Sequence, residues 1–380
     1  MNNIEYVRLT EVVDVNPRYN LTKNSKSHFV EMAAVDENFG TIRYFKNKAT
    51  SSSGLSKFKE KDILFARITP CTENGKVAIA TGLNGEIGLG STEFIVLSPK
   101  KVLSEWLYFL LKTPEIREDA IKNMKGTTGR QRVPIEFFET LYINVPKLSE
   151  QERIVKTLKI VREAIKKNNS AAQLSSSYPL SLLNKMLVQE ETEMVRLKDV
   201  CDIFDRDHRT PNYADKGIPL ISPANFTIRG INIEDVRHIS REEFENEKKK
   251  CAPKKNDILF SRIGTIGEVR YAPNIDFIPL HSIAVIRANP EKILHTYLYH
   301  ILQTYEVREQ ALAGVQSIGV PDLGLKKIEN IEIPLLSLST QKKFAENMLA
   351  FEKIWEKQMN AAEKLSFLAA SLSNKYFAVN

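Results

Sequence analysis

The sequence predicts an α+β fold with two copies of one globular α/β domain and two long helices that form an antiparallel coiled coil. Three observations predict it: one series of motifs occurs twice, each copy mixes short apolar runs with helical patterns, and each copy leads into a long helix with a 3.5-residue apolar repeat. We expect a first domain over 1–148, a helix over 149–190, a second domain over 191–337 and a helix over 338–380.

The repeat has an offset of about 190 residues. Val7–Val12 reads VRLTEV and returns as VRLKDV at Val195–Val200. Asp62–Ile68 reads DILFARI and returns as DILFSRI at Asp257–Ile263. The order of the motifs is the same in both copies, so the chain is a duplicated unit.

Each domain is expected to contain buried strands and short helices. Short runs rich in Ile, Val and Phe between turn residues are typical of buried strands. The predicted strands are Ile63–Ile68, Phe94–Leu97, Ile258–Ile263 and Ile283–Ile286, and the predicted helices are Ser104–Lys112 and Lys292–Gln303.

The long helices show apolar residues at alternating steps of four and three. The first predicted seam is Ile154, Leu158, Val161 and Ile165, and the second is Phe344, Met348, Phe351 and Trp355. Ser149 and Glu152 have the spacing of a capping box, which places the start of the first helix at Ser149. Pro179 should kink or end that helix after Ser177.

One polar residue falls at the same place in each seam: Asn168 in the first helix and Gln358 in the second. A polar side chain at a core position fixes register and partner orientation at a cost in stability. Two amides tolerated near water explain the pair equally well. Antiparallel pairing of the helices would relate the two domains by an approximate two-fold axis and hold them at a fixed separation. Such an arrangement suits a DNA target with two half-sites.

Composition narrows the possible functions. The 380 residues carry 54 Lys and Arg against 47 Asp and Glu, a net charge of +7 that is a modest argument for a polyanionic partner. The mixed-charge segment 241–255 is interpreted as a solvated helix face. Three isolated cysteines and six scattered histidines predict inert thiols and no metal site. No apolar run is long enough for a membrane span, and the first residues lack the pattern of a signal peptide, so we expect a cytoplasmic protein.

The chain resembles the specificity subunit of type I restriction-modification systems. The likeness rests on the Gly126–Gln131 loop with Val133-Pro134 and on Ile143–Ile154, and in the second copy on Gly314–Ile318 and Ile331–Pro334. The resemblance implies two target recognition domains, each reading half of a split sequence in double-stranded DNA, with the helices as a ruler. It also implies two methyltransferase subunits and restriction motor-nuclease subunits as partners, which would carry S-adenosylmethionine, ATP and Mg²⁺.

Candidate DNA contacts are chosen for side chains that match base edges or phosphates. The loop Gly126–Arg132 combines glycines with hydroxyl, amide and guanidinium groups, and Gln316 and Ser317 lie in its counterpart. Arg67 and Arg262 follow equivalent strands, and each is either a DNA contact or a structural arginine paired with a carboxylate such as Asp62 or Asp257. The full set of candidates is Arg67, Lys76, Thr128, Arg130, Gln131, Arg132, Arg206, Arg209, Arg262, Gln316 and Ser317.

The chain shows no complete catalytic motif. Asn16-Pro17-Arg18-Tyr19 falls one residue short of the turn of an adenine methyltransferase, and the segment around Gly75-Lys76 lacks the opening glycine and closing hydroxyl of a phosphate loop. We therefore expect no catalytic residues, no metal site and no cofactor in this chain. The alternatives are a stand-alone nuclease or methyltransferase with scattered catalytic residues, and an adaptor without affinity for nucleic acid.

Overall fold

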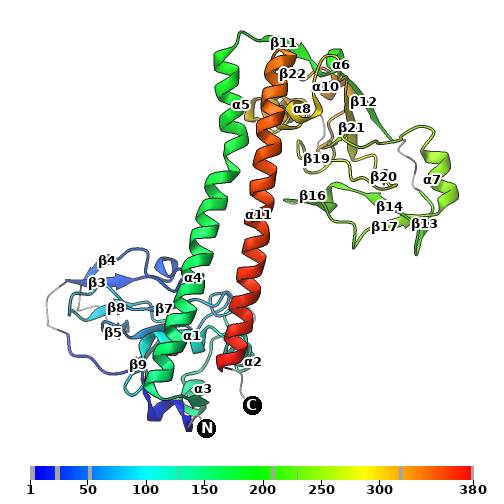
Figure 1. Cartoon of the computed structure of the whole chain (residues 1–380). Coiled ribbons are helices and arrows are strands. Elements are labelled where there is room, and N and C mark those ends of the chain that lie inside the picture. The colour runs from blue at the N-terminus through cyan, green and yellow to red at the C-terminus, as the bar shows by residue number, and fades with distance from the viewer. Residues whose placement is uncertain are drawn as a thin grey trace. The chain divides into compact units, whose positions relative to one another are not determined.

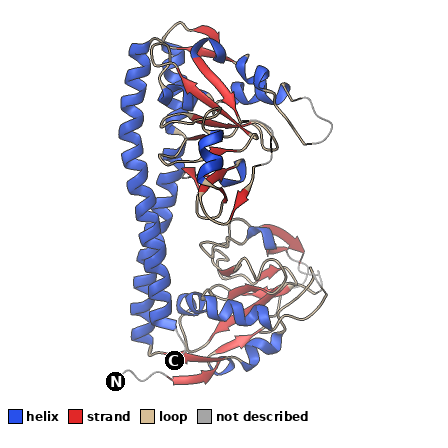
Figure 2. Cartoon of the chain, turned by 90° about the vertical axis from the view of Figure 1, so that its right-hand side faces the viewer, coloured by secondary structure: helices blue, strands red, loops and turns tan. Residues whose placement is uncertain are grey.

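The computed structural model describes residues 5–21, 26–49, 54–127, 129–206, 209, 211–228, 230–315 and 320–377. The chain divides into two compact units. Unit 1 comprises Met1–Ser170 together with Asn360–Asn380, and unit 2 comprises Ala171–Met359. Each unit combines sheets with helices, which confirms the predicted mixture of the two (Figures 1 and 2).

Unit 1 contains two four-stranded sheets and a two-stranded ribbon. The central sheet has the antiparallel order β2-β9-β6-β7, and the distal sheet has the order β4-β3-β8-β5 with β3 and β8 parallel. The ribbon pairs β1 with β10. The strands are β1 Glu5–Arg8, β2 Val13–Val15, β3 Lys26–Val30, β4 Lys46–Ala49, β5 Ser56–Phe58, β6 Ile63–Ala66, β7 Val77–Ile79, β8 Gly88–Gly90, β9 Phe94–Pro99 and β10 Tyr142–Val145.

Unit 2 repeats this plan. Its central sheet has the order β12-β21-β18-β19, its distal sheet the order β13-β17-β14-β20, and its ribbon pairs β11 with β22. A short hairpin, β15-β16, stands where unit 1 has the single bridge between Val35 and Ile42. The strands are β11 Glu193–Arg196, β12 Cys201–Asp205, β13 Tyr213–Ala214, β14 Ile218–Ile221, β15 Phe226–Thr227, β16 Gly230–Ile231, β17 Arg237–Ile239, β18 Ile258–Ser261, β19 Val269–Tyr271, β20 Ile278–Pro279, β21 Ile283–Ala288 and β22 Glu332–Leu335.

Short helices flank the central sheets. They are α1 Ser104–Leu111, α2 Pro114–Lys122 and α3 Ile135–Thr140 in unit 1, and α6 Leu197–Val200, α7 Arg241–Glu247, α8 His295–Ile301, α9 Tyr305–Ala313 and α10 Leu325–Glu329 in unit 2. Single 3₁₀ turns lie at Leu9–Glu11, Met32–Ala34 and Pro223–Asn225. The helix predicted from Lys292 starts later because Lys292 and Ile293 instead close a turn onto the carbonyl of Asn289.

The middle strands β6 and β18 are almost entirely apolar because both faces of the central sheet are covered. Ile63 and Phe65 point into the core formed with the helices, whereas Leu64 and Ala66 point into the core formed with the distal sheet. Ile258 and Leu259 divide in the same way in unit 2. Alternate side chains of a strand point to opposite faces, so a strand buried on both faces loses its polar positions.

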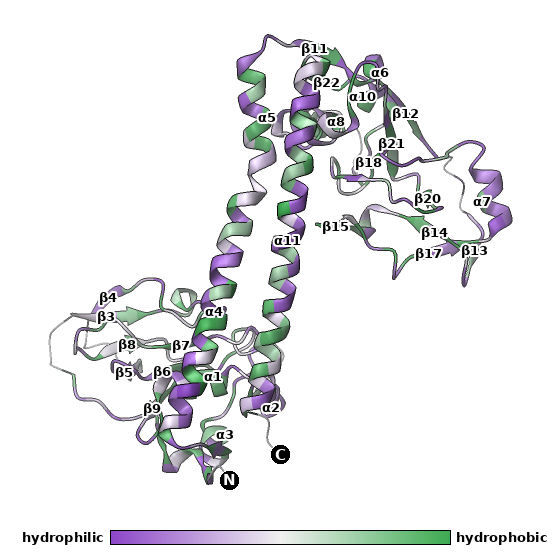
Figure 3. Cartoon of the chain, in the orientation of Figure 1, coloured by the Kyte–Doolittle hydropathy of each residue, from purple (hydrophilic) through white to green (hydrophobic). Residues whose placement is uncertain are grey.

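The long helices are α4 Leu148–Ser176, α5 Tyr178–Gln189 and α11 Leu338–Phe377. Hydrophobic and hydrophilic residues alternate along them (Figure 3). The break between α4 and α5 falls where Pro179 predicts it, to within one residue. Among the described helices, none combines the length and the apolar character that a membrane span requires.

The start of each long helix is tied to its unit by a buried glutamine. Gln151 accepts a hydrogen bond from Leu103 N at 2.9 Å and donates to Pro146 O at 2.8 Å. Gln341 accepts from Leu294 N at 2.7 Å and donates to Leu336 O at 2.8 Å. Both side chains are almost fully buried. The predicted capping box is therefore wrong, because α4 begins at Leu148 and Ser149 lies inside its first turn.

Each unit also packs side chains of the long helices into its own core. In unit 1, Phe377 at the end of α11 contacts Trp106, with ring centroids 6.0 Å apart. In unit 2, Phe344 near the start of α11 contacts His300 at 5.3 Å, and Phe351 contacts Tyr178 of α5 at 5.4 Å. The helix starts and ends thus contribute to the core of each unit.

Replacing Gln341 by Met should lower the free energy of unfolding by about 1–3 kcal/mol, because Leu294 N and Leu336 O would stay buried without partners. Urea unfolding followed by circular dichroism measures the change. Gln303→Met, at an exposed position, is the matched control and should change stability by less than about 0.5 kcal/mol. Equal effects of the two substitutions would contradict an anchoring role for Gln341.

Candidate nucleic-acid interface

The two units share one backbone arrangement after the central strands β6 and β18. In unit 1, Arg67 N donates to Glu93 O at 2.9 Å, and Val133 N donates to Arg67 O at 2.8 Å. In unit 2, Arg262 N donates to Ser282 O at 2.9 Å, and Leu323 N donates to Arg262 O at 2.8 Å. Single bridges pair Ile68 with Arg132 and Ile263 with Asp322. Arg67 therefore corresponds to Arg262, and Arg132 corresponds to Asp322.

The predicted loop of unit 1 is closed by a pair of backbone hydrogen bonds. Lys125 N donates to Arg132 O and Arg132 N donates to Lys125 O, both at 2.9 Å. Gly126 has φ +123°, and a Cβ there would lie 3.0 Å from Arg130 O. Arg130 is exposed and Gln131 is partly buried. The closed loop therefore presents a guanidinium and an amide on a constrained backbone, a combination that suits base edges or phosphates.

Arg132 is held by Glu93 in a bidentate ion pair. Its Nη2 lies 2.7 Å from Glu93 Oε1 and its Nε lies 2.9 Å from Oε2. Hydrogen bonding to Arg132 lowers the pKa of Glu93, and the charge of Arg67 adds to the effect. The Arg132 side chain is still 41% exposed. Arg132 is thus oriented by Glu93 and keeps an open edge.

At the position of Arg132, unit 2 has an acidic residue, Asp322, which pairs with Arg262. The side chain of Arg262 is 4% exposed and lies 2.8 Å from Asp205 and 2.9 Å from Asp322. Of the two interpretations of Arg262, the geometry favours the structural arginine. The expected partner Asp257 instead pairs with Arg287 at 2.7 Å. In unit 1, Asp62 accepts from Tyr19 OH and Lys59 N, each at 2.8 Å, and does not pair with Arg67.

Two further basic candidates of unit 2 pair with carboxylates of α7. Arg206 is buried and its Nε lies 2.7 Å from Glu247 Oε2. Arg209 is 61% exposed and lies 2.6 Å from Glu243 Oε1. Because Glu243 and Glu247 are buried, the interpretation of segment 241–255 as a solvated face needs correction: the first part of that segment is α7, which packs one face against the unit. Burial removes Arg206 and Arg262 from the surface that DNA would touch.

The remaining candidates are placed as follows. Lys76 is 15% exposed and lies 3.6 Å from Glu37 and 3.3 Å from Met32 O, so its charge is largely satisfied within unit 1. Thr128, Gln316 and Ser317 lie outside the described residues.

The predicted seam residues lie at different depths in the units. Those near the starts of α4 and α11 are buried, and those farther along are partly buried. The buried ones are Ile154, Leu158, Val161, Phe344 and Met348, and the partly buried ones are Ile165, Asn168, Phe351, Trp355 and Gln358.

The edge strands of the distal sheet of unit 1 carry lysines that the sequence argument missed. Lys46 is 57% exposed and lies 2.7 Å from Glu31, and Lys48 Nζ stands 4.3 Å from the ring centre of Phe29. Lys57 is also exposed. The sequence does contain a sign of these lysines. Between residues 26 and 61 the chain has seven Lys and Arg against four Asp and Glu, with aromatic residues among them. Such a surface suits phosphate contacts.

Other chemistry has little support in the geometry. No group of three or more His, Cys, Asp and Glu side chains within the described ranges could hold a metal ion. The three cysteines are free, and burial raises the pKa of Cys201 and Cys251 to about 12. Thiols with such a pKa are almost entirely protonated at neutral pH and are therefore poor nucleophiles.

Comparison with known proteins identifies the family. The family model described as type I restriction modification DNA specificity domain matches residues 1–175 and 189–364, so the chain belongs to this family and the predicted resemblance is confirmed. The EcoAI specificity subunit of Escherichia coli is 35% identical over 156 residues, which are 40% of this chain and 26% of that protein. The MjaVIII specificity subunit of Methanocaldococcus jannaschii is 23% identical over 85% of this chain and 81% of that protein.

Solved structures show the same fold. The type I system S subunit from M. genitalium has a TM-score of 0.62 and 15% identity, covering 100% of this chain and 97% of its own. A chain from a study of complex assembly and conformational transition of the type I R-M system has a TM-score of 0.62 and 19% identity, covering 98% and 97%. The chain spans only about a quarter of the length of the E. coli relatives EcoAI and EcoEI.

Arg262→Met should lower the free energy of unfolding by about 1–3 kcal/mol, because Asp205, which is 18% exposed, would lose its counter-charge, whereas Asp322, which is 45% exposed, would stay hydrated. Arg130→Ala, at an exposed position in the loop of unit 1, should change it by less than about 0.5 kcal/mol. Chemical denaturation of both variants checks this. A stable Arg262→Met protein would mean that the buried pairs are dispensable to the fold.

Proposed function

We propose that this chain is the DNA-reading specificity subunit of a type I restriction-modification complex and reads a bipartite sequence in double-stranded DNA, with one half-site for each unit. The observation that carries the proposal is the shared backbone arrangement after β6 and β18 with different side chains on it. Unit 1 presents Arg130 and Arg132 there, whereas unit 2 places Asp322 at the position of Arg132. Equivalent frames with different side chains should read different half-sites.

The catalytic steps belong, in this proposal, to partner subunits. Two methyltransferase subunits would bind S-adenosylmethionine, and restriction motor-nuclease subunits would use ATP and Mg²⁺. The chain itself would act in the cytoplasm as a non-catalytic reader and scaffold. Support comes from the family membership and from the lack of a complete catalytic motif in the sequence.

The long helices would set the distance between the half-sites. The domains proposed from the sequence, 1–148 and 191–337, would be joined by helical segments over 149–190 and 338–380 as an antiparallel pair with approximate two-fold symmetry. Asn168 and Gln358 would fix the register of that pair. DNA favours such a ruler because a fixed distance along its axis corresponds to a fixed number of base pairs.

The affinity for DNA, with and without the methyltransferase subunits, should fall as salt rises, with a log–log slope near −0.9 for each phosphate neutralised. Fluorescence anisotropy measures the slope. Lys46→Ala with Lys48→Ala in the distal sheet should reduce its magnitude by about 1–2, and Lys198→Ala is the control at an exposed position outside that sheet. A flat salt response would favour an adaptor, and cleavage or methyl transfer by the chain alone would favour an enzyme.

Inserting four residues, about one helical turn, into both α4 and α11 should lengthen the unspecified spacer of the target and leave each half-site unchanged. The turn adds about 6 Å, or about two base pairs. Sequencing the methylated positions in the DNA of a host that carries the variant reads out the spacer. An unchanged spacer in a variant that still methylates would show that the helices do not measure distance.

A further inference from the structure

An equivalent site lies in each unit between the edge strand of the central sheet, the helix that follows the sheet, and a long helix. In unit 1 these elements are β7, α1 and α4, and the loop Asp36–Arg43 fills the site. Gly40 O accepts from Ile79 N of β7 at 3.1 Å, and Phe39 O accepts from Arg162 Nη1 of α4 at 3.3 Å. A Cβ on Gly40 would lie 2.1 Å from the ring of Tyr108 in α1. The loop therefore contacts β7, α1 and α4.

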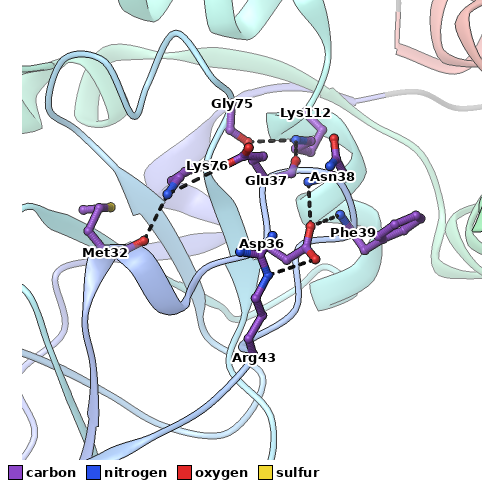
Figure 4. Close-up of polar contacts among 9 residues, drawn as sticks. All are labelled: Met32, Asp36, Glu37, Asn38, Phe39, Arg43, Gly75, Lys76 and Lys112. Atoms are coloured by element: carbon purple, nitrogen blue, oxygen red, sulfur yellow. Dashed lines mark hydrogen bonds and ion pairs between the residues drawn. The ribbon is translucent and has the colours of Figure 1, made fainter. Parts of the chain in front are cut away.

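The loop of unit 1 is built to keep this conformation (Figure 4). Asp36 accepts from Asn38 N at 2.8 Å and Phe39 N at 3.0 Å and pairs with Arg43. Lys112 donates to Glu37 O at 2.6 Å, and burial lowers the pKa of Lys112 to about 8. Beside the loop, α1 and α4 are joined by the Glu105–Lys159 ion pair at 3.0 Å. The chain therefore closes this site by itself.

In unit 2 the β15-β16 hairpin stands in the place of this loop, because Phe226 pairs with Ile231 as Val35 pairs with Ile42 in unit 1. Thr227 O of the hairpin accepts from Arg270 Nε of β19 at 2.6 Å, and the corresponding site stays partly open.

A cavity of about 360 Å³ is lined there by residues of β19, α8 and α11, among them Tyr271, His295, Thr296, Leu349 and Glu352. Loop residues, Lys255 among them, complete the lining. The repeat aligns Thr296 with Glu105, Leu349 with Lys159 and Glu352 with Arg162. The ion pair that joins the two helices in unit 1 thus has no equivalent in unit 2.

The edge strand of unit 2 offers an unused backbone donor at this place. Ile258 and Tyr271 form a non-hydrogen-bonded pair, because the neighbouring bond runs from Ala272 N to Asp257 O, as the bond from Ala80 N to Asp62 O does in unit 1. Tyr271 N therefore points away from its own sheet, as Ile79 N does. Within the described residues it donates to no acceptor, whereas Ile79 N binds the carbonyl of Gly40.

The side chains around this donor suit an aromatic and a basic group. Tyr271 stacks on Tyr299 with centroids 4.1 Å apart, and His295 meets Tyr271 edge-on at 6.0 Å, which makes an aromatic wall. Glu352 forms no ion pair with any described residue; it is an exposed residue whose carboxyl group has its pKa raised by partial desolvation. A cation beside Glu352 would relieve that cost.

We infer that the open site of unit 2 binds an extended segment of a partner protein, with a backbone carbonyl on Tyr271 N, an aromatic side chain on the Tyr271–Tyr299 stack and a basic side chain at Glu352. Pairing of an extended segment with an exposed edge strand is a general mode of peptide recognition. The loop of unit 1 is the internal precedent, since it places a carbonyl on the equivalent amide and a phenylalanine beside it. The peptide site is inferred independently of the proposed function. Only the identification of the partner as a subunit of the restriction-modification complex rests on that function.

The first test uses the full chain and a blocked peptide of residues 38–43, Asn-Phe-Gly-Thr-Ile-Arg, as the probe. Saturable binding by isothermal titration is expected. Thr296→Glu with Leu349→Lys, which recreates the ion pair of unit 1 across the cavity, should weaken binding at least tenfold. The matched control, Glu105→Thr with Lys159→Leu in unit 1, should leave the probe affinity unchanged. Absence of saturable binding, or equal binding by the closed variant, would overturn the inference.

The second test places a photo-crosslinking residue at Leu349, which is 58% exposed, in the complex assembled with methyltransferase and restriction subunits. A crosslink to a partner segment that carries an aromatic residue next to a basic one is expected, and the same residue at Lys159 should give none. Crosslinks confined to this chain would overturn the inference. DNA binding of the chain is measured separately, so its loss would count against the proposed function and not against the peptide site.

Discussion

The structure depends on how each long helix is attached to its unit. A long helix keeps a fixed orientation within its unit only if its first turn is anchored, and Gln151 and Gln341 provide that anchor. Each bonds the strand end that precedes the helix and the turn that opens α1 or α8. A buried primary amide suits this role because it donates and accepts at once. An apolar residue would fill the space but leave two backbone groups without partners.

The central sheet gives the two units the same backbone arrangement, whereas the side chains carried on it differ. Strands buried on both faces fix the positions of the residues that follow them, so Arg67 and Arg262 make the same backbone bonds. The side chains beside them then differ without disturbing the frame: Arg132 pairs with Glu93 in unit 1, and Asp322 pairs with Arg262 in unit 2. An acidic residue in place of Arg132, beside an arginine that both units share, changes the local charge and therefore what the surface offers to a ligand.

Much of the fold was predictable because it depends on local patterns. The runs around Ile63 and Ile258 are strands, the break near Pro179 is present, and the duplication is visible in the sequence. The site was less predictable because ion pairs link residues far apart in the chain. Arg262 pairs with Asp205 and Asp322, and Arg206 pairs with Glu247. The spacing of these residues in the sequence does not predict the ion pairs. The start of α4 was misplaced because its first turn is anchored by the bond between Gln151 and Leu103 N, a long-range contact that no local pattern reveals.

The buried ion pairs also change what the net charge means. A charge of +7 suggests a broadly basic protein, but Arg206, Arg262 and Arg287 are neutralised by carboxylates inside unit 2. Unit 2 has 25 Lys and Arg against 26 Asp and Glu, so the excess of positive charge lies in unit 1, where Arg130 and Lys46 are exposed. Counting basic residues therefore overstates the attraction of unit 2 for a polyanion, and its half of any DNA contact must rely more on hydrogen bonds and shape than on charge.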